Sequence, residues 1–287
     1  MEDILLVLIY TFGVGFVGTG LGGLIGALIK KDSNKQTSLL LSAAGGVMLS
    51  VVSFELVGQA VGSLGDMSHI LASLIVTVSI LLGVGLIYLG NKVLDDYTEK
   101  RNAHIDEFHP KTHDDLNELI HSDEYNNAKN KKEMFKAGMI MVFAIALHNF
   151  PEGLSVGSTF ISSKSTGIFL AVLLAVHKIP EGMAIVMPLI NGGTSKKKAI
   201  LITALSGLPT MLGAVIGLAI GSFGPLGQAI SLSLASGAMV YVIFCEIIPQ
   251  STLMYKSKSP GFFTIFGFIL GKLLMDFIEF LLTILQK

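Results

Sequence analysis

The sequence has little charge and almost no cysteine. Charged residues make up 14% of the 287 residues and hydrophobic residues 51%, whereas a typical soluble domain carries about 25% charged residues. The single cysteine, Cys245, excludes an intrachain disulfide and every zinc or redox motif that needs paired cysteines. We therefore expect an integral membrane protein that performs no thiolate chemistry.

Basic residues form no extended surface either. The 20 lysines and arginines are balanced by 21 acidic residues and fall in short clusters between apolar segments. A nucleic-acid partner, which needs a continuous basic face, is therefore excluded. The first residues, Met1-Glu2-Asp3, are acidic where a secretory signal is basic, so we interpret the apolar run 4–29 as a membrane span.

Eight apolar stretches are long enough to cross a bilayer as helices, which takes about 20 residues each. They are residues 4–29, 37–58, 70–93, 134–161, 166–190, 198–221, 226–253 and 260–284. We predict an all-α integral membrane protein with eight transmembrane helices. Its parts are helices 1–3 (residues 1–93), a polar, histidine-bearing loop (94–133), helices 4 and 5 (134–190) and helices 6–8 (191–287).

The basic residues also predict how the chain is oriented in the membrane. Sixteen of the twenty lysines and arginines lie in alternate loops, beginning with the loop after the first span. Loops rich in lysine and arginine stay in the cytoplasm. We therefore expect a multi-pass protein of the cell membrane, embedded in the lipid bilayer, with loop 94–133 in the cytoplasm and both termini outside.

Two pairs of spans resemble each other in sequence. Residues 46–55 of the second span align with 237–246 of the seventh, and the fourth and fifth spans share a six-residue motif. Because the members of each pair cross the membrane in opposite directions, we predict a 3+2+3 arrangement with inverted repeats, which is typical of secondary transporters. The glycines of the first span either allow close helix packing or reflect how common glycine is in membrane helices.

The shared motif is His-x-x-Pro-Glu-Gly, at residues 148–153 and again at 177–182. A histidine and a glutamate four residues apart lie on one face of a helix, so each copy turns an imidazole and a carboxylate to the same side. Each proline removes a backbone donor and frees one carbonyl, that of Leu147 in the first copy and Val176 in the second. The motif thus combines potential ligands with opened backbone.

Two interpretations of these pairs are open. Each pair can form a hydrogen bond that ties helices together, or it can supply half of a metal site. The repetition favours the metal site, since ionisable residues inside membranes are costly and mark functional positions. Imidazoles and carboxylates suit Zn²⁺, Fe²⁺, Mn²⁺ or Co²⁺, whereas Cu(I) would need the thiolates that the chain lacks.

With these motifs, the histidine-bearing loop and the outward termini, the sequence resembles the ZIP family of divalent-metal transporters over all eight spans, and most of all the bacterial zinc-uptake members. The resemblance implies transport of divalent transition-metal ions into the cytoplasm, with zinc as the leading substrate and iron, manganese, cobalt or cadmium as others. It also implies an elevator-like form of alternating access and a two-metal site between spans four, five and six. The metal is then a transported substrate, and a homodimer is a candidate assembly.

The resemblance assigns roles to individual residues. His148, Glu152, His177 and Glu181 match the main metal site. Asn149 matches a ligand of the second site, which Glu152 and Glu181 share as bridging groups. Met48 in span two matches a methionine that lines the main site in some members, although methionine in a membrane helix is commonly a packing residue.

Two ligands of the family's second site are missing from this chain. Lys178 follows His177 where the family has asparagine or aspartate, and Pro209-Thr210 replaces a segment that carries a glutamate. A buried ammonium beside the carboxylates can supply the positive charge of the second ion. We therefore predict a one-metal site with Lys178 as counter-ion; the alternative is that Lys178 points away toward an interface.

Other charged residues lie within the spans. Glu55 and Glu246 occupy equivalent positions of the repeat, so we predict that they line the pathway, with Glu246 near the inner exit. Lys272, Asp276 and Glu279 in the last span form either a self-paired structural set or part of the pathway. The histidines of loop 94–133 are candidates for weak metal binding.

One enzymatic alternative also follows from the residues. Histidine and glutamate at helical spacing build hydrolytic zinc sites, so the chain could be an intramembrane metal-dependent hydrolase. That function lacks its usual His-Glu-x-x-His signature here, and it gives the internal repeat no role. A purely structural scaffold would leave the paired ligands unexplained, so transport, and no enzyme activity, is the prediction.

Overall fold

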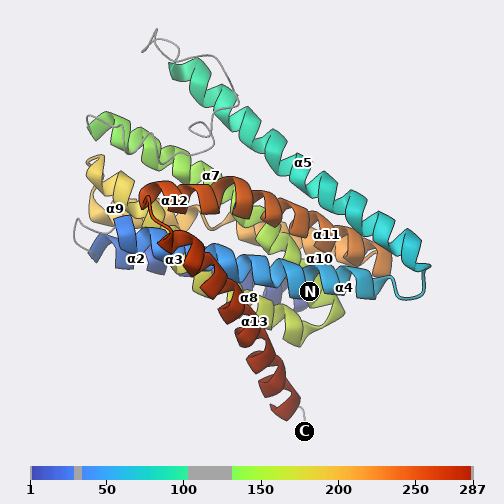
Figure 1. Ribbon diagram of the computed structural model, residues 1–287. Coiled ribbons are helices and arrows are strands. Elements are labelled where there is room, and N and C mark those ends of the chain that lie inside the picture. The colour runs from blue at the N-terminus through green and yellow to red at the C-terminus, as the bar shows by residue number, and fades with distance from the viewer. Residues whose placement is uncertain (1, 29–33, 103–130, 286–287) are drawn as a thin grey trace.

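The computed structural model describes residues 2–28, 34–102 and 131–285, and within these ranges every regular element is a helix (Figure 1). The N-terminal half contains α1 (Glu2–Phe12), η1 (Gly13–Gly18), α2 (Thr19–Leu28), α3 (Asn34–Ser50), η2 (Val51–Leu56), α4 (Val57–Ser63) and α5 (His69–Asn102). The C-terminal half contains α7 (Lys131–Ser162), α8 (Lys164–Asn191), α9 (Lys196–Leu205), α10 (Pro209–Gly221), α11 (Pro225–Val242), η3 (Ile243–Ile247), α12 (Ile248–Met254) and α13 (Ser259–Leu285). The prediction of an all-α protein is confirmed.

Seven helical segments in the described part of the chain are long and apolar enough to cross a membrane. They are Ile4–Leu28, Ser38–Ser63, His69–Val93, Lys164–Asn191, Lys196–Gly221, Pro225–Met254 and Ser259–Phe277. The eighth expected span falls in α7, whose 32 residues are long enough to cross but include a central His-Asn-x-Pro-Glu-Gly segment. The chain is a multi-span membrane protein, and its division into 3+2+3 helices stays a prediction.

Three of the membrane segments contain a short π-helix. Two of them, η2 and η3, occupy matching positions in the sequence repeat of residues 46–55 and 237–246. Glu55 lies in η2 and Glu246 lies in η3. A π-helical turn holds an extra residue, and such turns are frequent at functional sites. The two similar segments therefore share a local backbone form as well as a sequence pattern.

Glycines bring the backbones of α7 and α8 against neighbouring helices. A Cβ added to Gly153 would lie 1.9 Å from the carbonyl oxygen of Thr210 on α10, and one on Gly22 would lie 2.2 Å from the carbonyl of Ile179 on α8. Side chains at these positions would overlap the neighbouring backbone, so the helices can approach this closely only at glycine. We call α1, η1, α2 and α7–α10 the site group, because close glycine contacts of this kind join several of its helices.

The other helices form a second set with the same kind of contact. A Cβ on Gly46 of α3 would lie 2.0 Å from the carbonyl of Thr264 on α13, and one on Gly237 of α11 would lie 1.9 Å from that of Ile80 on α5. We call α3, η2, α4, α5, α11, η3, α12 and α13 the flanking group. Within the described ranges, only Gly227 of α11 makes such a close contact with backbone of the other group. A Cβ on Gly227 would lie 2.2 Å from the carbonyl oxygen of Ile220, beside the turn that joins α10 to α11.

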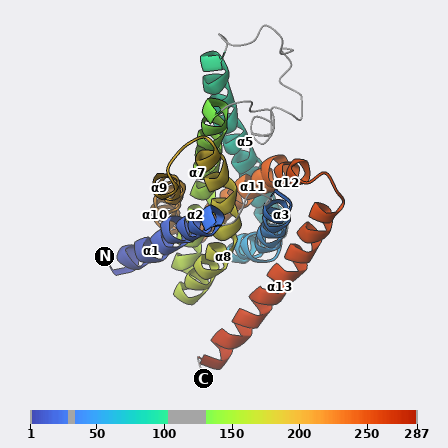
Figure 2. The ribbon, with the colours of Figure 1, turned by 90° about the vertical axis from the view of Figure 1, so that its left-hand side faces the viewer.

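The space between the two groups is mainly apolar. The main hydrophobic core combines buried residues of α8, such as Leu170 and Leu174, with Met48 of α3 and Leu232 and Met239 of α11. Figures 1 and 2 show the C-terminal half of α13 projecting away from the other helices. Each group is therefore tightly packed internally, while side chains fill the boundary between them.

Candidate metal site

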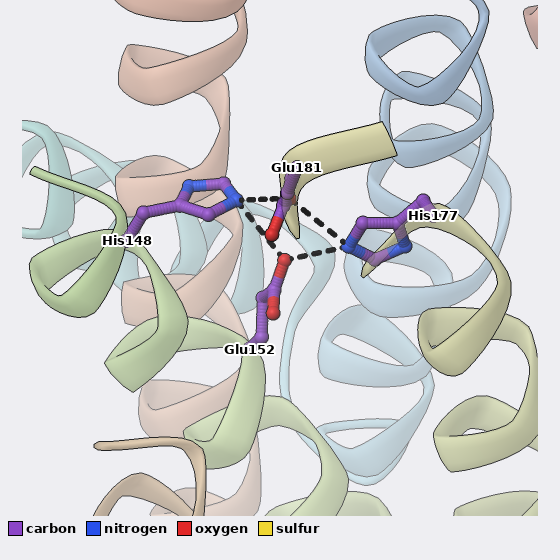
Figure 3. Close-up of side chains that lie close together, drawn as sticks. All are labelled: His148, Glu152, His177 and Glu181. Atoms are coloured by element: carbon purple, nitrogen blue, oxygen red, sulfur yellow. Dashed lines mark hydrogen bonds and ion pairs between the residues drawn. The ribbon is translucent and has the colours of Figure 1, made fainter. Parts of the chain in front are cut away.

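Four residues of the twin motif meet inside the site group. His148 and Glu152 come from α7, and His177 and Glu181 come from α8 (Figure 3). None of the four is more than 3% exposed. One ligand atom from each lies within 4.8 Å of the corresponding atoms of the other three. The structure therefore brings together all four residues that the sequence assigns to the main site.

The contacts among the four are reciprocal. Glu152 Oε1 lies 3.1 Å from His148 Nε2 and 2.7 Å from His177 Nε2. Glu181 Oε1 lies 3.1 Å from His148 Nε2 and 3.6 Å from His177 Nε2. Each carboxylate thus directs one oxygen, Oε1, at both imidazoles. The two helices share a single cluster in place of two separate His-Glu pairs.

Both helices continue through the prolines of the motif. Pro151 lies inside α7, and Pro180 lies inside α8. The glycine after each Pro-Glu pair contacts a neighbouring backbone, since a Cβ on Gly182 would lie 2.2 Å from the carbonyl of Thr19. The histidine and glutamate of each copy stay one helical turn apart, as a continuous helix requires. The prolines and glycines therefore shape the packing around the ligands without separating them.

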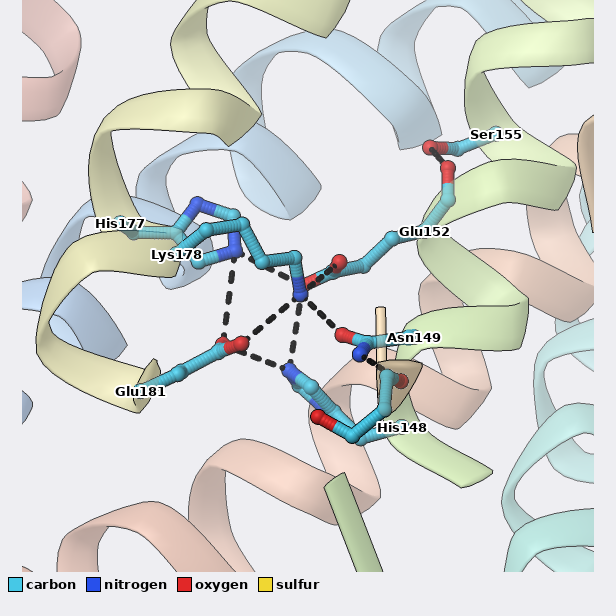
Figure 4. Close-up of polar contacts among 8 residues, drawn as sticks. His148, Asn149, Glu152, Ser155, His177, Lys178 and Glu181 are labelled. Atoms are coloured by element: carbon cyan, nitrogen blue, oxygen red, sulfur yellow. Dashed lines mark hydrogen bonds and ion pairs between the residues drawn. The ribbon is translucent and has the colours of Figure 1, made fainter. Parts of the chain in front are cut away.

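Lys178 is fully buried beside this cluster (Figure 4). Its ammonium forms ion pairs with Glu152 Oε2 and with Glu181 Oε2, the latter at 2.8 Å, and it donates a hydrogen bond to Asn149 Oδ1. The alternative in which Lys178 points toward an interface is therefore wrong. Burial of a lysine is costly unless its charge is compensated, and here two carboxylates compensate it.

The two carboxylates divide their oxygens between two kinds of partner. Oε1 of each faces the imidazoles, and Oε2 of each faces the ammonium of Lys178. Glu152 and Glu181 therefore form a bridge with a nitrogen-lined side and a cationic side. The ammonium of Lys178 thus contacts both carboxylates through the oxygens that do not face the imidazoles.

Asn149 is held at its other end by the backbone of Ser206. Its Nδ2 donates a hydrogen bond of 2.7 Å to the Ser206 carbonyl, and both residues are buried. Ser206 lies in the three-residue turn that separates α9 from α10. Sequence reasoning had no reason to select Ser206, because a backbone carbonyl carries no side-chain signature. The proline at 209 was the available signal that the helix breaks there.

The remaining candidates lie at different places around the cluster. Met48, on α3, is fully buried in the main hydrophobic core. Glu55 is partly buried and accepts a hydrogen bond of 2.5 Å from Gln59 Nε2. Glu246 accepts a hydrogen bond from Asn91 on α5. Their roles in binding or transport stay predictions.

Two further groups of residues were singled out in the sequence. Lys272 and Asp276 form an ion pair with each other on an exposed face of α13, in line with a self-paired structural set. The histidines of the polar loop, at 104, 109, 113 and 121, lie outside the residues that the structure describes.

A small cavity adjoins the cluster on one side. Its volume is about 30 Å³, and its walls include His148, Glu181, Glu246 and Gln250. Met141, one of its lining residues, precedes the histidine along α7, so the cavity lies on the side of the cluster nearest the N-terminal end of that helix. The cavity links two ligands of the cluster to the acidic residue of η3.

The donor set fits a borderline divalent cation. Two imidazole nitrogens and two carboxylate oxygens are common zinc ligands, and tetrahedral coordination at 2.0–2.1 Å places such atoms about 3.3 Å apart. The four nitrogen–oxygen distances, 2.7 to 3.6 Å, span this value. Nε2 of each imidazole and Oε1 of each carboxylate are thus the four atoms that could hold a single ion.

Comparison with known proteins identifies the family of this chain. The family model described as ZIP Zinc transporter matches residues 5–279. The zinc transporter ZupT of Chlorobium chlorochromatii is 32% identical over 277 residues, covering 96% of each chain. The protein of that name from Akkermansia muciniphila is 33% identical over 279 residues, again covering 96% of each, and that from Clostridium perfringens is 31% identical, covering 96% of this chain and 95% of its own.

These matches extend across the membrane helices and include both copies of the motif. They leave the intramembrane hydrolase without support, because the family and the relatives are transporters. The chain therefore belongs to the ZIP family of zinc transporters and is a membrane transporter with a metal ion as substrate, not an enzyme.

Proposed function

We propose that the protein imports Zn²⁺ into the cytoplasm by alternating access through a one-ion site made by His148, Glu152, His177 and Glu181. Fe²⁺, Mn²⁺, Co²⁺ and Cd²⁺ are further candidate substrates, because the same nitrogen and oxygen donors bind them. The observation that carries the proposal is the buried cluster of four ligand atoms, all within 4.8 Å of one another, in the middle of two membrane helices.

The charges around the site support a single ion. With neutral imidazoles, two carboxylates and one ammonium give a formal charge of −1, so one divalent cation changes it to +1. A second divalent cation would give +3 in a buried site, where uncompensated charge is strongly unfavourable. Lys178 also occupies the Oε2 side of both carboxylates. We therefore assign Lys178 the role of a built-in counter-ion.

The cavity beside the site supports release toward the cytoplasm. It lies nearest the ends of α7 and α12 that border the basic loops 94–133 and 254–258. Those loops are cytoplasmic by the distribution of lysine and arginine, which also puts both termini outside a cell membrane. Glu246 and Gln250 then line the inner part of the pathway, and Glu55 belongs to its outer part. The domain division and the homodimer remain predictions.

The two helix groups support alternating access by movement of one group past the other. Glycines bring helix backbones together within the site group and, in the flanking group, within the pairs α3–α13 and α5–α11, whereas the boundary between the groups is filled mainly by apolar side chains. Two polar contacts cross it near the opposite end of α7 from the cavity: Ser158 Oγ lies 2.5 Å from Ser231 Oγ on α11, and Ser162 Oγ donates a hydrogen bond of 2.9 Å to Gln228 Oε1 on the same helix. A boundary of this kind allows sliding at small cost, because few directional contacts must break.

Transport can be tested with the purified protein in liposomes. Vesicles containing the protein are expected to accumulate Zn²⁺ detected by an internal dye, and the other four cations should compete according to their fit to the site. Protein-free vesicles, and vesicles containing the His148→Ala, His177→Ala double variant, are the controls. Equal zinc accumulation in all three preparations would contradict the proposed function.

A disulfide across the boundary is expected to stop the movement. In a Cys245→Ser background, Ser158→Cys and Ser231→Cys place two thiols where the hydroxyl oxygens now lie 2.5 Å apart. Oxidation should reduce zinc uptake by about tenfold or more, because α7 and α11 can no longer slide, and reduction should restore it. Each single-cysteine variant, treated in the same way, is the control; full uptake by the oxidised pair would exclude relative movement at this boundary.

A further inference from the structure

Both polar atoms of the Asn149 side-chain amide form hydrogen bonds in this structure. Its Oδ1 accepts a hydrogen bond from Lys178 Nζ, and its Nδ2 donates one of 2.7 Å to the carbonyl of Ser206 (Figure 4). The side chain is 0% exposed. An amide has one acceptor oxygen and one donor nitrogen group, and each is directed at a different neighbour. The orientation of the amide is therefore determined from both sides.

The carbonyl that fixes Asn149 is available because the sixth span is broken. In an uninterrupted helix, the Ser206 carbonyl would accept from the amide of Thr210, four residues on. Here the chain turns after α9, and the Thr210 amide instead donates a hydrogen bond of 3.2 Å to the carbonyl oxygen of Gly207. Pro209 begins α10 and itself offers no amide. The break thus presents a backbone acceptor to a side chain on α7.

These contacts connect into a single chain of interactions. The Ser206 carbonyl holds the Asn149 amide, the amide oxygen holds the Lys178 ammonium, and the ammonium pairs with Oε2 of Glu152 and Glu181. A lysine side chain has four flexible bonds, so without a fixed acceptor its ammonium could reach either oxygen of each carboxylate. The amide restricts the ammonium to the side away from the imidazoles.

We propose that Asn149 is a positioning residue for Lys178 and does not bind the transported metal. Resting on the one-ion site proposed above, this assigns to Ser206 and Asn149 the task of keeping the ammonium on Oε2, which leaves Oε1 of both carboxylates for the metal. Ligation by Asn149 would require its oxygen to release Lys178. The buried ammonium would then lose one of its three acceptors, which is unfavourable in an apolar surrounding.

A double-mutant cycle between the two residues tests the proposal. Zinc affinity is measured by isothermal titration for the wild type, Asn149→Ala, Lys178→Met and the double variant in detergent. We expect Asn149→Ala to weaken binding about tenfold, because a freed ammonium competes with the metal for Oε1. In the Lys178→Met background the same substitution should change the affinity by less than about twofold, since its effect passes through the ammonium.

X-ray absorption at the zinc edge supplies a readout that packing alone would not change. The number of nitrogen and oxygen neighbours of bound zinc should be the same in Asn149→Ala as in the wild type. Loss of an oxygen neighbour, or an equal loss of affinity in both backgrounds, would show that Asn149 is a ligand and overturn the proposal. Both measurements require variants with an unchanged elution profile in size-exclusion chromatography.

Asn149→Asp gives an independent test if the alanine variant does not fold. Aspartate is the better metal ligand, so a ligating position would keep or increase the affinity. A positioning role predicts weaker binding, because the carboxylate meets the Ser206 carbonyl oxygen without a hydrogen to donate. Wild-type protein that binds two zinc ions, or none, would contradict the proposed function itself; one bound ion with an additive cycle would contradict only the role of Asn149.

Discussion

Replacing Glu152 with glutamine is expected to reduce zinc uptake by about 100-fold or more. Breaking a buried charge pair by removing one partner costs about 3–5 kcal/mol, and each 1.4 kcal/mol corresponds to a factor of about ten. Glu152 contacts both imidazoles through Oε1 and Lys178 through Oε2. The substitution keeps the size of the side chain but removes the charge on which all three partners depend.

The loss should appear in both binding and transport. Glutamine can offer one carbonyl oxygen, and its amide nitrogen would meet either an imidazole or the ammonium as a second donor. Titration of the purified variant should show a corresponding loss of zinc affinity, and the liposome assay should show little accumulation. Asp276→Asn is the matched control, because this acid pairs with Lys272 on the exposed face of α13. Normal zinc uptake by the Glu152→Gln protein would show that Glu152 is not part of the transport site.

Replacing Lys178 with aspartate is expected to change the number of bound zinc ions from one to two. The substitution removes a positive charge from the Oε2 side of Glu152 and Glu181 and adds a carboxylate there. The formal charge of the group, with neutral imidazoles, falls from −1 to −3. Asn149 Oδ1, freed from the ammonium, then becomes a further oxygen donor for an ion on that side.

Elemental analysis of the dialysed protein measures this change directly. The wild type should retain one zinc per chain, the Lys178→Asp variant two, and Lys178→Met one, because methionine removes the charge without adding an oxygen ligand. Methionine occupies a similar volume, so this variant separates the effect of charge from that of packing. Two zinc ions in the wild type, or one in the aspartate variant, would contradict the counter-ion role of Lys178.

The sequence predicted that His148, Glu152, His177 and Glu181 lie together, because their spacing and their surroundings are both informative. A histidine and a glutamate four residues apart must share a helix face, and the repeated motif in two neighbouring spans made a common site the simplest arrangement. The helical class followed from apolar runs of sufficient length. These features are local, so they can be recognised in the sequence without knowledge of how the helices pack.

The sequence predicted Lys178 beside the carboxylates but left its outward orientation open, and it did not predict the hydrogen bonds of Asn149 to Lys178 and Ser206. These contacts depend on packing that the sequence does not encode locally. Whether a lysine beside a motif turns inward depends on which helix covers it, and here a Cβ on Gly18 of η1 would lie 3.1 Å from the Lys178 Cβ. Ser206 contributes a carbonyl, which every residue possesses. The π-helices of three spans were likewise not predicted from the sequence.

The glycines show where a sequence pattern had two interpretations that packing resolves. Many glycines in the first span were compatible with close helix approach or with ordinary membrane composition. Gly15, Gly22 and Gly26 all face another helix at distances where a Cβ would overlap it. Gly13, in the same segment, has open space around its Cβ position. Close approach therefore accounts for several of these glycines but not for all.

Because the ammonium is part of the chain, its occupancy of the site does not depend on the metal concentration. A second metal ion in place of the ammonium would bind only when the free metal concentration is high enough. Because the two ions would share the same carboxylates, binding of one would affect binding of the other. The Lys178 ammonium is present at the carboxylates at every concentration, because its local concentration is set by the side chain and not by the solution. For the one-ion site proposed above, we therefore expect loading to follow a simple hyperbola and uptake to be proportional to the zinc concentration when zinc is scarce.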